Sequence, residues 1–147
     1  MGFLDSINIS ASALTAERLR MDVISKNIAS ANITRTANGT PYRRQVVVFQ
    51  ESEKDKPFSS YLTTELNRFS KGGVKVTSVI EDKSEFKQVY NPGHPDANEN
   101  GYVQMPNVDI MVEMVNMISA TRAYEANVTS INSTKNMVMK ALDIGRI

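Results

Sequence analysis

The segment DIMVEMVNMISATRAYEANVTSINSTKNMVMKALD, residues 109–143, decides the fold. It contains no Gly or Pro, and apolar residues recur along it at alternating intervals of four and three. Eight of the ten positions with this spacing are apolar: Ile110, Met114, Met117, Thr121, Tyr124, Val128, Ile131, Lys135, Val138 and Leu142. A sustained heptad pattern is typical of a helix that packs along another helix. We therefore expect one long helix, with Asn107 or Asp109 as its N-cap and Gly145 just beyond its end.

The N-terminal segment follows the same spacing. Six of eight positions are apolar in the series Leu4, Ile7, Ala11, Leu14, Arg18, Met21, Ser25 and Ile28. The pattern holds over residues 3–33 and then dissolves in TANGTP at residues 36–41. Gly and Pro in such a run end a helix. The sequence therefore predicts a second long helix at the other end of the chain.

Between the helical segments the pattern becomes extended. Residues 42–50 (YRRQVVVFQ) and 74–80 (VKVTSVI) are rich in β-branched residues, and residues 86–90 and 102–105 are short apolar segments between turn residues. Residues 51–73 are charged, then rich in Ser and Thr, and end in two glycines, which is typical of a mobile loop. We expect an N-terminal helix within residues 1–36, a β-rich middle region at 37–106 and a C-terminal helix within 107–147.

Helix length suggests the shape. At 1.5 Å per residue the two helices would span roughly 52 Å and roughly 46 Å, whereas a compact globule of this chain length is about 40 Å across. The expected fold is therefore mainly α with a small β-rich middle region. Its long terminal helices form a coiled-coil-like pair in an elongated molecule.

The C-terminal helix carries little charge. Residues 109–143 contain four acidic and three basic side chains, and the positions away from the apolar stripe are mostly Asn, Ser and Ala. Small uncharged side chains allow neighbouring helices to approach closely at a low desolvation cost. We therefore predict an assembly interface, a helical core within and between subunits, made by the stripe residues Ile7, Leu14, Met21, Ile28, Met114, Met117, Tyr124, Val128, Ile131, Val138 and Leu142.

Composition excludes several classes of function. The chain has no Cys, a single His, and 17 Lys and Arg against 16 Asp and Glu. These counts exclude a catalytic thiol and a Cys-ligated zinc, and they argue against a nucleic-acid binder, which needs a basic surface. No secretory signal peptide and no membrane-spanning run is expected. We predict no catalytic residue, no cofactor and no metal site.

One segment partly matches a metal-binding template. Asp96, Asn98, Asn100 and Gly101 resemble the first half of a calcium loop, but its twelfth position is Asn107 in place of the bidentate Glu. A polar turn is the expectation here, with calcium as the alternative. The neighbouring His94 is expected to be an ordinary loop residue, and Glu81 with Asp82 a charged turn between strands.

Several motifs in order along the chain resemble a known family. They are Ser12-Ala13-Leu14, Arg20-Met21-Asp22-Val23-Ile24, Asn27-Ile28-Ala29, Pro41-Tyr42-Arg43-Arg44, His94-Pro95-Asp96-Ala97-Asn98, Gly101-Tyr102-Val103, Pro106-Asn107-Val108 and the run from Arg122 to Val128. Together they are similar to the bacterial flagellar rod and hook axial proteins, and within these to the proximal-rod FlgC type. The insertion at residues 31–36 before Pro41 and the short middle region favour this type over its neighbours.

The resemblance implies a nonenzymatic axial subunit of the proximal rod, which assembles into the helical drive shaft of the flagellar basal body. It implies as partners further copies of itself, the B-type and F-type rod subunits, the basal-body adaptor FliE and the flagellar type III export apparatus. It implies export across the inner membrane, with neither nucleic acid nor direct membrane insertion. The alternative is a coiled-coil adaptor or regulatory protein of the flagellar export system, which would stop at a defined heterodimer where a rod subunit continues to polymerise.

Overall fold

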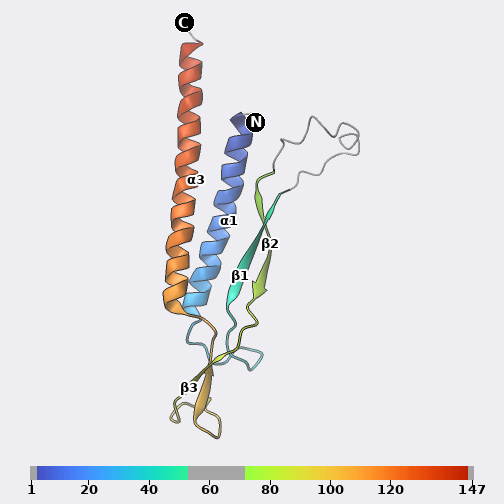
Figure 1. Cartoon of the computed structure of the whole chain (residues 1–147), viewed down its shortest axis with the longest axis vertical. Coiled ribbons are helices and arrows are strands. Elements are labelled where there is room, and N and C mark those ends of the chain that lie inside the picture. The colour runs from blue at the N-terminus through green and yellow to red at the C-terminus, as the bar shows by residue number, and fades with distance from the viewer. Residues whose placement is uncertain (1–2, 53–71, 146–147) are drawn as a thin grey trace, which may run out of the picture. The chain divides into compact units, whose positions relative to one another are not determined.

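The computed structural model describes residues 3–52 and 72–145, and most of the loop expected at residues 51–73 lies outside the described residues. In chain order the elements are α1 (Phe3–Ala29), β1 (Gln45–Glu51), β2 (Val74–Glu81), β3 (Lys87–Tyr90), β4 (Tyr102–Met105) and α3 (Ile110–Ile144) (Figure 1). Two helices thus flank a small strand-rich middle region, which confirms the expected fold class of a mainly helical chain with short strands.

The chain divides into two compact units. Unit 1 comprises residues 1–18, 49–77 and 121–147, and unit 2 comprises residues 19–48 and 78–120. Each unit therefore contains a part of α1, a part of the β1–β2 pair and a part of α3.

The helix ends follow local hydrogen bonding. The Asp109 side chain is the N-cap of α3, because its Oδ1 accepts from the backbone N–H groups of Met111 and Val112 at 3.0 and 3.4 Å. Gly145 follows the last residue of α3, and its N–H donates to the Ala141 carbonyl at 3.2 Å. Both α3 ends therefore agree with the sequence expectation to within one residue.

The helix α1 ends earlier than expected, at Ala29 and not at Ile33. Turn hydrogen bonds replace the helical pattern after it, with the Ala31 N–H donating to the Ile28 carbonyl and the Ile33 N–H donating to the Ser30 carbonyl. The physical reason is a contact distant in sequence: the side chain of Asn27 in the last turn binds the backbone of Gln45. The chain turns away after Ala29 so that β1 can reach that side chain.

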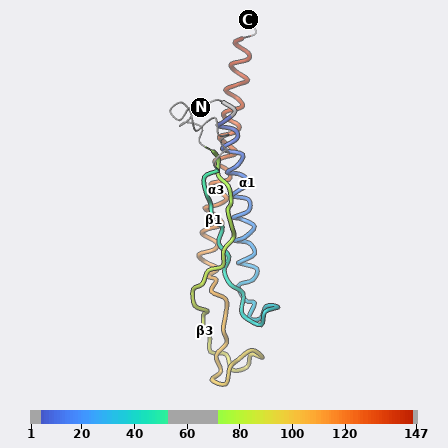
Figure 2. The backbone as a smooth tube through the Cα atoms, turned by 90° about the vertical axis from the view of Figure 1, so that its right-hand side faces the viewer, coloured from blue at the N-terminus to red at the C-terminus, as the bar shows by residue number. Residues whose placement is uncertain are grey.

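The strands form two two-stranded sheets, β1–β2 and β3–β4. Figure 2 follows the backbone through the labelled strands β1 and β3. β3 and β4 are antiparallel with Val89 opposite Val103 and Tyr90 opposite Tyr102. The two tyrosine rings meet edge to face with centroids 5.4 Å apart. Gly101 precedes β4 with φ of 76° and lies against the Tyr90 ring, so its place in this turn requires the conformational freedom of glycine.

In unit 1 the start of β2 packs tightly on α1. The Ser12 hydroxyl donates to the Ile9 carbonyl at 2.7 Å and accepts from the Val74 N–H at 3.0 Å. Gly73 lies so close to Ser12 that a Cβ atom on Gly73 would overlap the Ser12 side chain. The absence of a side chain at position 73 therefore permits this contact.

We expect Gly73→Ala to lower the free energy of unfolding by about 1–3 kcal/mol, the usual cost of forcing an extra methyl group into a packed contact. Thermal unfolding followed by circular dichroism measures the change. Ser12→Gly should recover part of the loss when combined with Gly73→Ala, because it removes the overlapping atoms. A loss that Ser12→Gly leaves unchanged would mean that the overlap is not its cause.

The core of unit 2 contains both apolar and polar side chains. Its buried apolar residues are Val23, Ile24, Ala31, Val103, Val108 and Ala120. Its buried polar residues include Asn27 and Glu113, each about 1% exposed. A buried polar group is costly unless it is hydrogen-bonded, so these two residues mark the part of the unit with the strictest geometry.

Within residues 3–52 and 72–145, neither helix is apolar enough over a sufficient length to cross a lipid bilayer.

Candidate functional site

Three segments far apart in the sequence meet at a buried polar cluster in unit 2. We name it the Asn27–Glu113 cluster. It comprises Asn27 in the last turns of α1, Tyr42 and Arg44 just before β1, Gln45 at the start of β1, and Glu113 in the first turn of α3. Its hydrogen bonds join residues separated by up to 86 positions in the chain. The cluster therefore forms only when all three segments are in place.

Asn27 uses its full hydrogen-bonding capacity. Its Nδ2 group donates to the Gln45 carbonyl oxygen at 2.8 Å and to Glu113 Oε2 at 2.9 Å. Its Oδ1 atom accepts from the Tyr42 hydroxyl at 2.9 Å and from the Gln45 N–H at 3.0 Å. An amide provides two donors and can accept two hydrogen bonds, so the reversed orientation would place donor against donor. The Asn27 side chain thus pairs with Gln45 as a neighbouring strand would.

Glu113 binds the two other segments at once. Its Oε1 atom accepts from Arg44 Nε at 2.9 Å and from Arg44 Nη2 at 2.8 Å, while its Oε2 atom accepts from Asn27. Arg44 also lies 3.6 Å from the Asp82 carboxylate, and its side chain is 26% exposed. A buried carboxylate is tolerated when it is paired and hydrogen-bonded, and Glu113 satisfies both conditions.

The environment keeps the tyrosine of the cluster protonated. Burial, together with the negative charges of Glu81 and Glu113, raises the pKa of the Tyr42 hydroxyl above its ordinary value of 10.0. The hydroxyl therefore remains a hydrogen-bond donor to Asn27 at neutral pH.

Asn107 holds the backbone of Arg44 in place. Its backbone N–H donates to Asn107 Oδ1 at 2.8 Å, and Asn107 Nδ2 donates to the Asp82 carbonyl at 3.0 Å and to the Ser84 hydroxyl at 2.8 Å. The Arg43 guanidinium lies 4.3 Å from the centroid of the Phe86 ring, on the same connection after β2. Both adjacent arginines also contact Asp82, because Arg43 Nη1 donates to its carbonyl oxygen at 3.3 Å and Arg44 Nη1 lies 3.6 Å from its carboxylate.

Two carboxylates in unit 2 have lowered pKa values. Hydrogen bonds from Ser84 and the charge of Arg44 lower the pKa of Asp82 below its ordinary value of 3.8. Hydrogen bonds from the Val112 and Met111 N–H groups, together with the charge of Lys87, likewise lower the pKa of Asp109 below 3.8. A carboxyl group whose pKa is lower in the folded chain than in the unfolded chain stabilises the fold at pH values above the unfolded-state pKa. This stabilisation is lost as the pH falls toward the pKa of the folded state.

We therefore expect the unfolding midpoint of the chain to fall as the pH drops from about 5 to about 3. The variant Asp82→Asn/Asp109→Asn should show a flatter pH dependence over this interval, because it lacks both titrating groups. Asn can still act as an N-cap at position 109, so the variant retains the start of α3. Thermal unfolding at several pH values measures the slope, and an unchanged slope in the variant would contradict the assignment.

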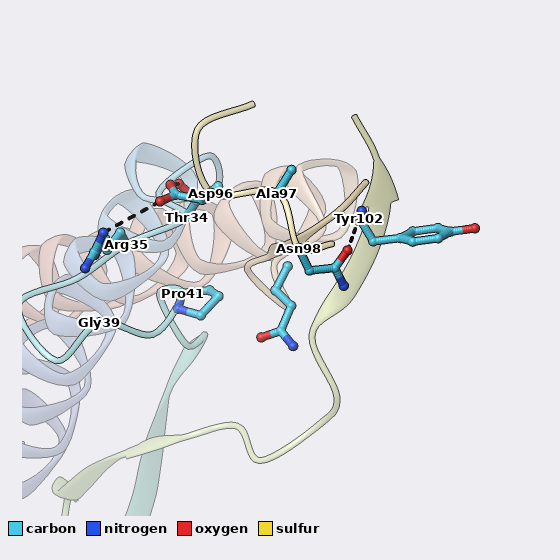
Figure 3. Close-up of a pocket in the computed structure, with 9 residues that line it drawn as sticks. Thr34, Arg35, Gly39, Pro41, Asp96, Ala97, Asn98 and Tyr102 are labelled. Atoms are coloured by element: carbon cyan, nitrogen blue, oxygen red, sulfur yellow. Dashed lines mark hydrogen bonds and ion pairs between the residues drawn. The ribbon is translucent and has the colours of Figure 1, made fainter. Parts of the chain in front are cut away.

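An open polar cavity of about 340 Å³ lies elsewhere in unit 2 (Figure 3). It is lined by residues of the turn after α1 and of the segment between β3 and β4, among them Thr34, Arg35 and Asp96. The Asp96 carboxylate accepts from the Thr34 hydroxyl at 2.8 Å and lies 3.9 Å from the Arg35 guanidinium. These contacts join the two walls to each other.

The segment that partly matched a calcium template forms a polar turn. Asn98 Oδ1 accepts from the N–H groups of Asn100 and Tyr102 at 3.1 and 2.8 Å, and Asp96 binds the opposite wall of the cavity. His94 Nδ1 accepts from the Asp96 N–H at 3.1 Å. Among the residues that the structure describes, no group of three or more His, Asp or Glu side chains could hold a metal ion.

The predicted interface residues lie on both helices and are incompletely buried. Half-buried members are Ile7, Leu14, Met21, Ile28, Met117, Tyr124, Val128, Ile131 and Val138, whereas Met114 and Leu142 are exposed. The fully buried positions of α3 are Glu113, Ala120 and Thr134, which the apolar stripe did not include. The role of the stripe as an assembly interface stays a prediction.

The sequence motifs included most residues of the Asn27–Glu113 cluster, but they did not predict that these residues form a buried hydrogen-bonded cluster. Asn27, Tyr42 and Arg44 stand in the motifs that carried the resemblance, but no role was predicted for them. Glu113 gave one signal, as the only charged residue between Ile110 and Ala120. A single acid in such an apolar segment needs a buried cation or a hydrogen-bond donor.

Comparison with known proteins gives consistent results over the whole chain. The family model described as "Flagella basal body rod protein" matches residues 7–35, and the one described as "Flagellar basal body rod FlgEFG protein C-terminal" matches residues 99–144. The flagellar basal-body rod protein FlgC of Bacillus subtilis (strain 168) is 52% identical over 147 residues, covering 96% of this chain and 97% of that protein.

Two further relatives have the same name. The protein from Borreliella burgdorferi is 46% identical over 98% of each chain. The protein from Salmonella typhimurium is 42% identical over 99% of this chain and all of its own length.

Proposed function

Because the chain belongs to the FlgC family of flagellar basal-body rod proteins, we infer its mode of action from the surface that its helices present. It is a structural subunit of the proximal rod in the flagellar basal body. We propose that copies assemble through their helices into the helical shaft that transmits torque.

The observation that carries this proposal is the apolar surface of α3. In unit 2, Met111 is 72% exposed and Val115 is 65% exposed. In unit 1, the exposed residues Met137, Met139 and Leu142 continue the apolar character toward the end of the helix. Met111 and Val115 are four positions apart and so share one face of the helix, and apolar residues gathered on one exposed face mark sites of protein association.

The segments of the chain divide this work. We propose that residues 1–36 and 107–147 form the axial core of the assembly, with the stripe residues in the contacts within and between subunits. The middle region, residues 37–106, then makes lateral contacts on the outside. The low charge of α3 supports this division, because charged faces would resist burial on several sides.

The subunit assembles with other components of the flagellar basal body. We propose that these are the B-type and F-type rod subunits and the adaptor FliE, and that the type III export apparatus carries the chain across the inner membrane. The relatives are named as rod proteins, and we propose that this chain likewise acts without catalysis, cofactor or nucleic acid.

Electron microscopy of basal bodies tests the proposed function. A strain that lacks this gene should yield basal bodies without a completed rod and should not swim. The same strain supplied with the intact gene should recover both. Complete rods in the deletion strain would show that the chain is not one of their structural subunits.

A further inference from the structure

The helix α3 offers two alternative rows of residues for packing against α1. Both rows use Met117 and Tyr124. The first row adds Met114, Thr121 and Val128, which complete a regular heptad and have the more apolar side chains. The second row adds Glu113, Ala120, Asn127 and Thr134 to Met117 and Tyr124, and its heptad spacing is equally regular. Hydrophobic patterning alone favours the first row.

Unit 2 nevertheless buries the second row. Glu113 is 1% exposed and Ala120 is fully buried, whereas Met114, the neighbour of Glu113, is 49% exposed. Adjacent helix positions differ by about 100° in direction, so the two rows correspond to two rotations of α3 about its own axis. The observed rotation buries a carboxylate and leaves a methionine in contact with solvent, which is the opposite of what burial energies favour.

The Asn27–Glu113 cluster explains this choice. With α3 in the observed rotation, the Glu113 carboxylate accepts from Asn27 Nδ2 and from two nitrogen atoms of Arg44. If α3 rotated to bury Met114, the carboxylate would leave and Asn27, itself 1% exposed, would lose one of its acceptors. An unpaired buried donor is penalised strongly, whereas the same group costs little when it is paired.

We propose that Asn27, Arg44 and Glu113 set the rotation of α3 within unit 2, and thereby keep Met111, Met114 and Val115 on its exposed surface. Buried polar residues that select one helix register over a more apolar alternative are known from coiled coils. Here the selected rotation keeps Met111, Met114 and Val115 out of the core of unit 2. This surface is the one that, in the proposed function, contacts further copies of the subunit.

Thiol labelling tests the proposal directly, because the chain has no Cys and any introduced thiol is unique. Two single-cysteine variants of the full chain, Met114→Cys and Ala120→Cys, report the two rotations. In the otherwise unchanged chain at low concentration, Cys at position 120 should react with iodoacetamide about tenfold or more slowly than Cys at position 114, as expected for protected against exposed sites.

The decisive test places the same two cysteines in the double variant Arg44→Met/Glu113→Met. This variant replaces the buried ion pair by apolar side chains, while Asn27 keeps its contacts with Tyr42 and Gln45. Replacing a buried ion pair by apolar groups of similar size preserves folding in other proteins. We expect position 114 to become protected and position 120 to become reactive, so that the order of the two labelling rates reverses. The matched control is Lys140→Met/Asp143→Met, which removes an exposed ion pair of the same helix and should leave the ratio unchanged.

Two results would overturn the proposal. An unchanged ratio in Arg44→Met/Glu113→Met would show that packing of the small residues sets the rotation without the cluster. Rapid labelling at both positions would show that the cluster maintains the fold and does not select between rotations. The variant Glu113→Gln, which keeps the side-chain length, is expected to show an intermediate ratio with position 120 still the slower. Rates are measured on the purified subunit, so this test is independent of motility.

Discussion

Replacement of Glu113 by alanine is expected to lower the free energy of unfolding by about 3–5 kcal/mol, the cost of removing one partner of a buried ion pair. The carboxylate is 1% exposed, and its removal leaves Asn27 and the Arg44 guanidinium facing a cavity. Because small domains are stable by about 5–15 kcal/mol, this single change removes a large part of the stability of unit 2. Urea unfolding followed by circular dichroism measures the loss.

Two controls separate this cause from general effects of substitution. Glu125→Ala removes an exposed carboxylate from the same helix and should change stability by less than about 0.5 kcal/mol. Glu113→Gln should cost less than Glu113→Ala, because the amide keeps the volume and one acceptor oxygen. Equal losses for Glu113→Ala and Glu125→Ala would mean that the buried contacts contribute nothing to stability.

Replacement of Val115 by aspartate is expected to abolish swimming while the isolated subunit remains folded. Val115 is 65% exposed, so a polar residue there changes monomer stability by about 0.5 kcal/mol or less. In an assembled rod, the proposed helix contacts would bury this carboxylate without a partner, at a cost of several kcal/mol for each subunit. Swimming in soft agar and electron microscopy of basal bodies measure the outcome.

The control for this experiment is Val115→Ile, which keeps an apolar β-branched side chain and should preserve swimming. Circular dichroism of both purified variants establishes that each remains helical. Normal swimming of the Val115→Asp strain would place this face of α3 outside every contact of the rod.

Periodicity was sufficient to predict the elements of the fold. Asp109 and the apolar period were enough to predict the start of α3, and Gly145 was enough to predict its end, because both signals are local. The end of α1 was predicted at Ile33 because the apolar pattern continues to that residue. The helix stops at Ala29, since Asn27 binds Gln45, and no local pattern encodes a contact across 18 positions.

The candidate site could be predicted only in part, for a similar reason. An apolar stripe selects the residues with the most apolar side chains, and it therefore chose Met114 over its neighbour Glu113. The structure buries Glu113, because Asn27 and Arg44 approach from segments 86 and 69 positions away. Hydrophobicity scales assign the carboxylate to the surface, and only knowledge of its distant partners reverses that assignment.

The distance in sequence between Asn27 and Glu113 also has a consequence for timing. A chain that leaves a ribosome or a narrow export channel with its N-terminus first presents α1 long before residue 113 emerges. Until then, Asn27 has no carboxylate to bind, and closing the intervening loop of 86 positions carries an entropic cost. Unit 2 therefore cannot complete its fold until more than three quarters of the chain has emerged, and a copy passing through such a channel would keep unit 2 open until residue 113 has left it.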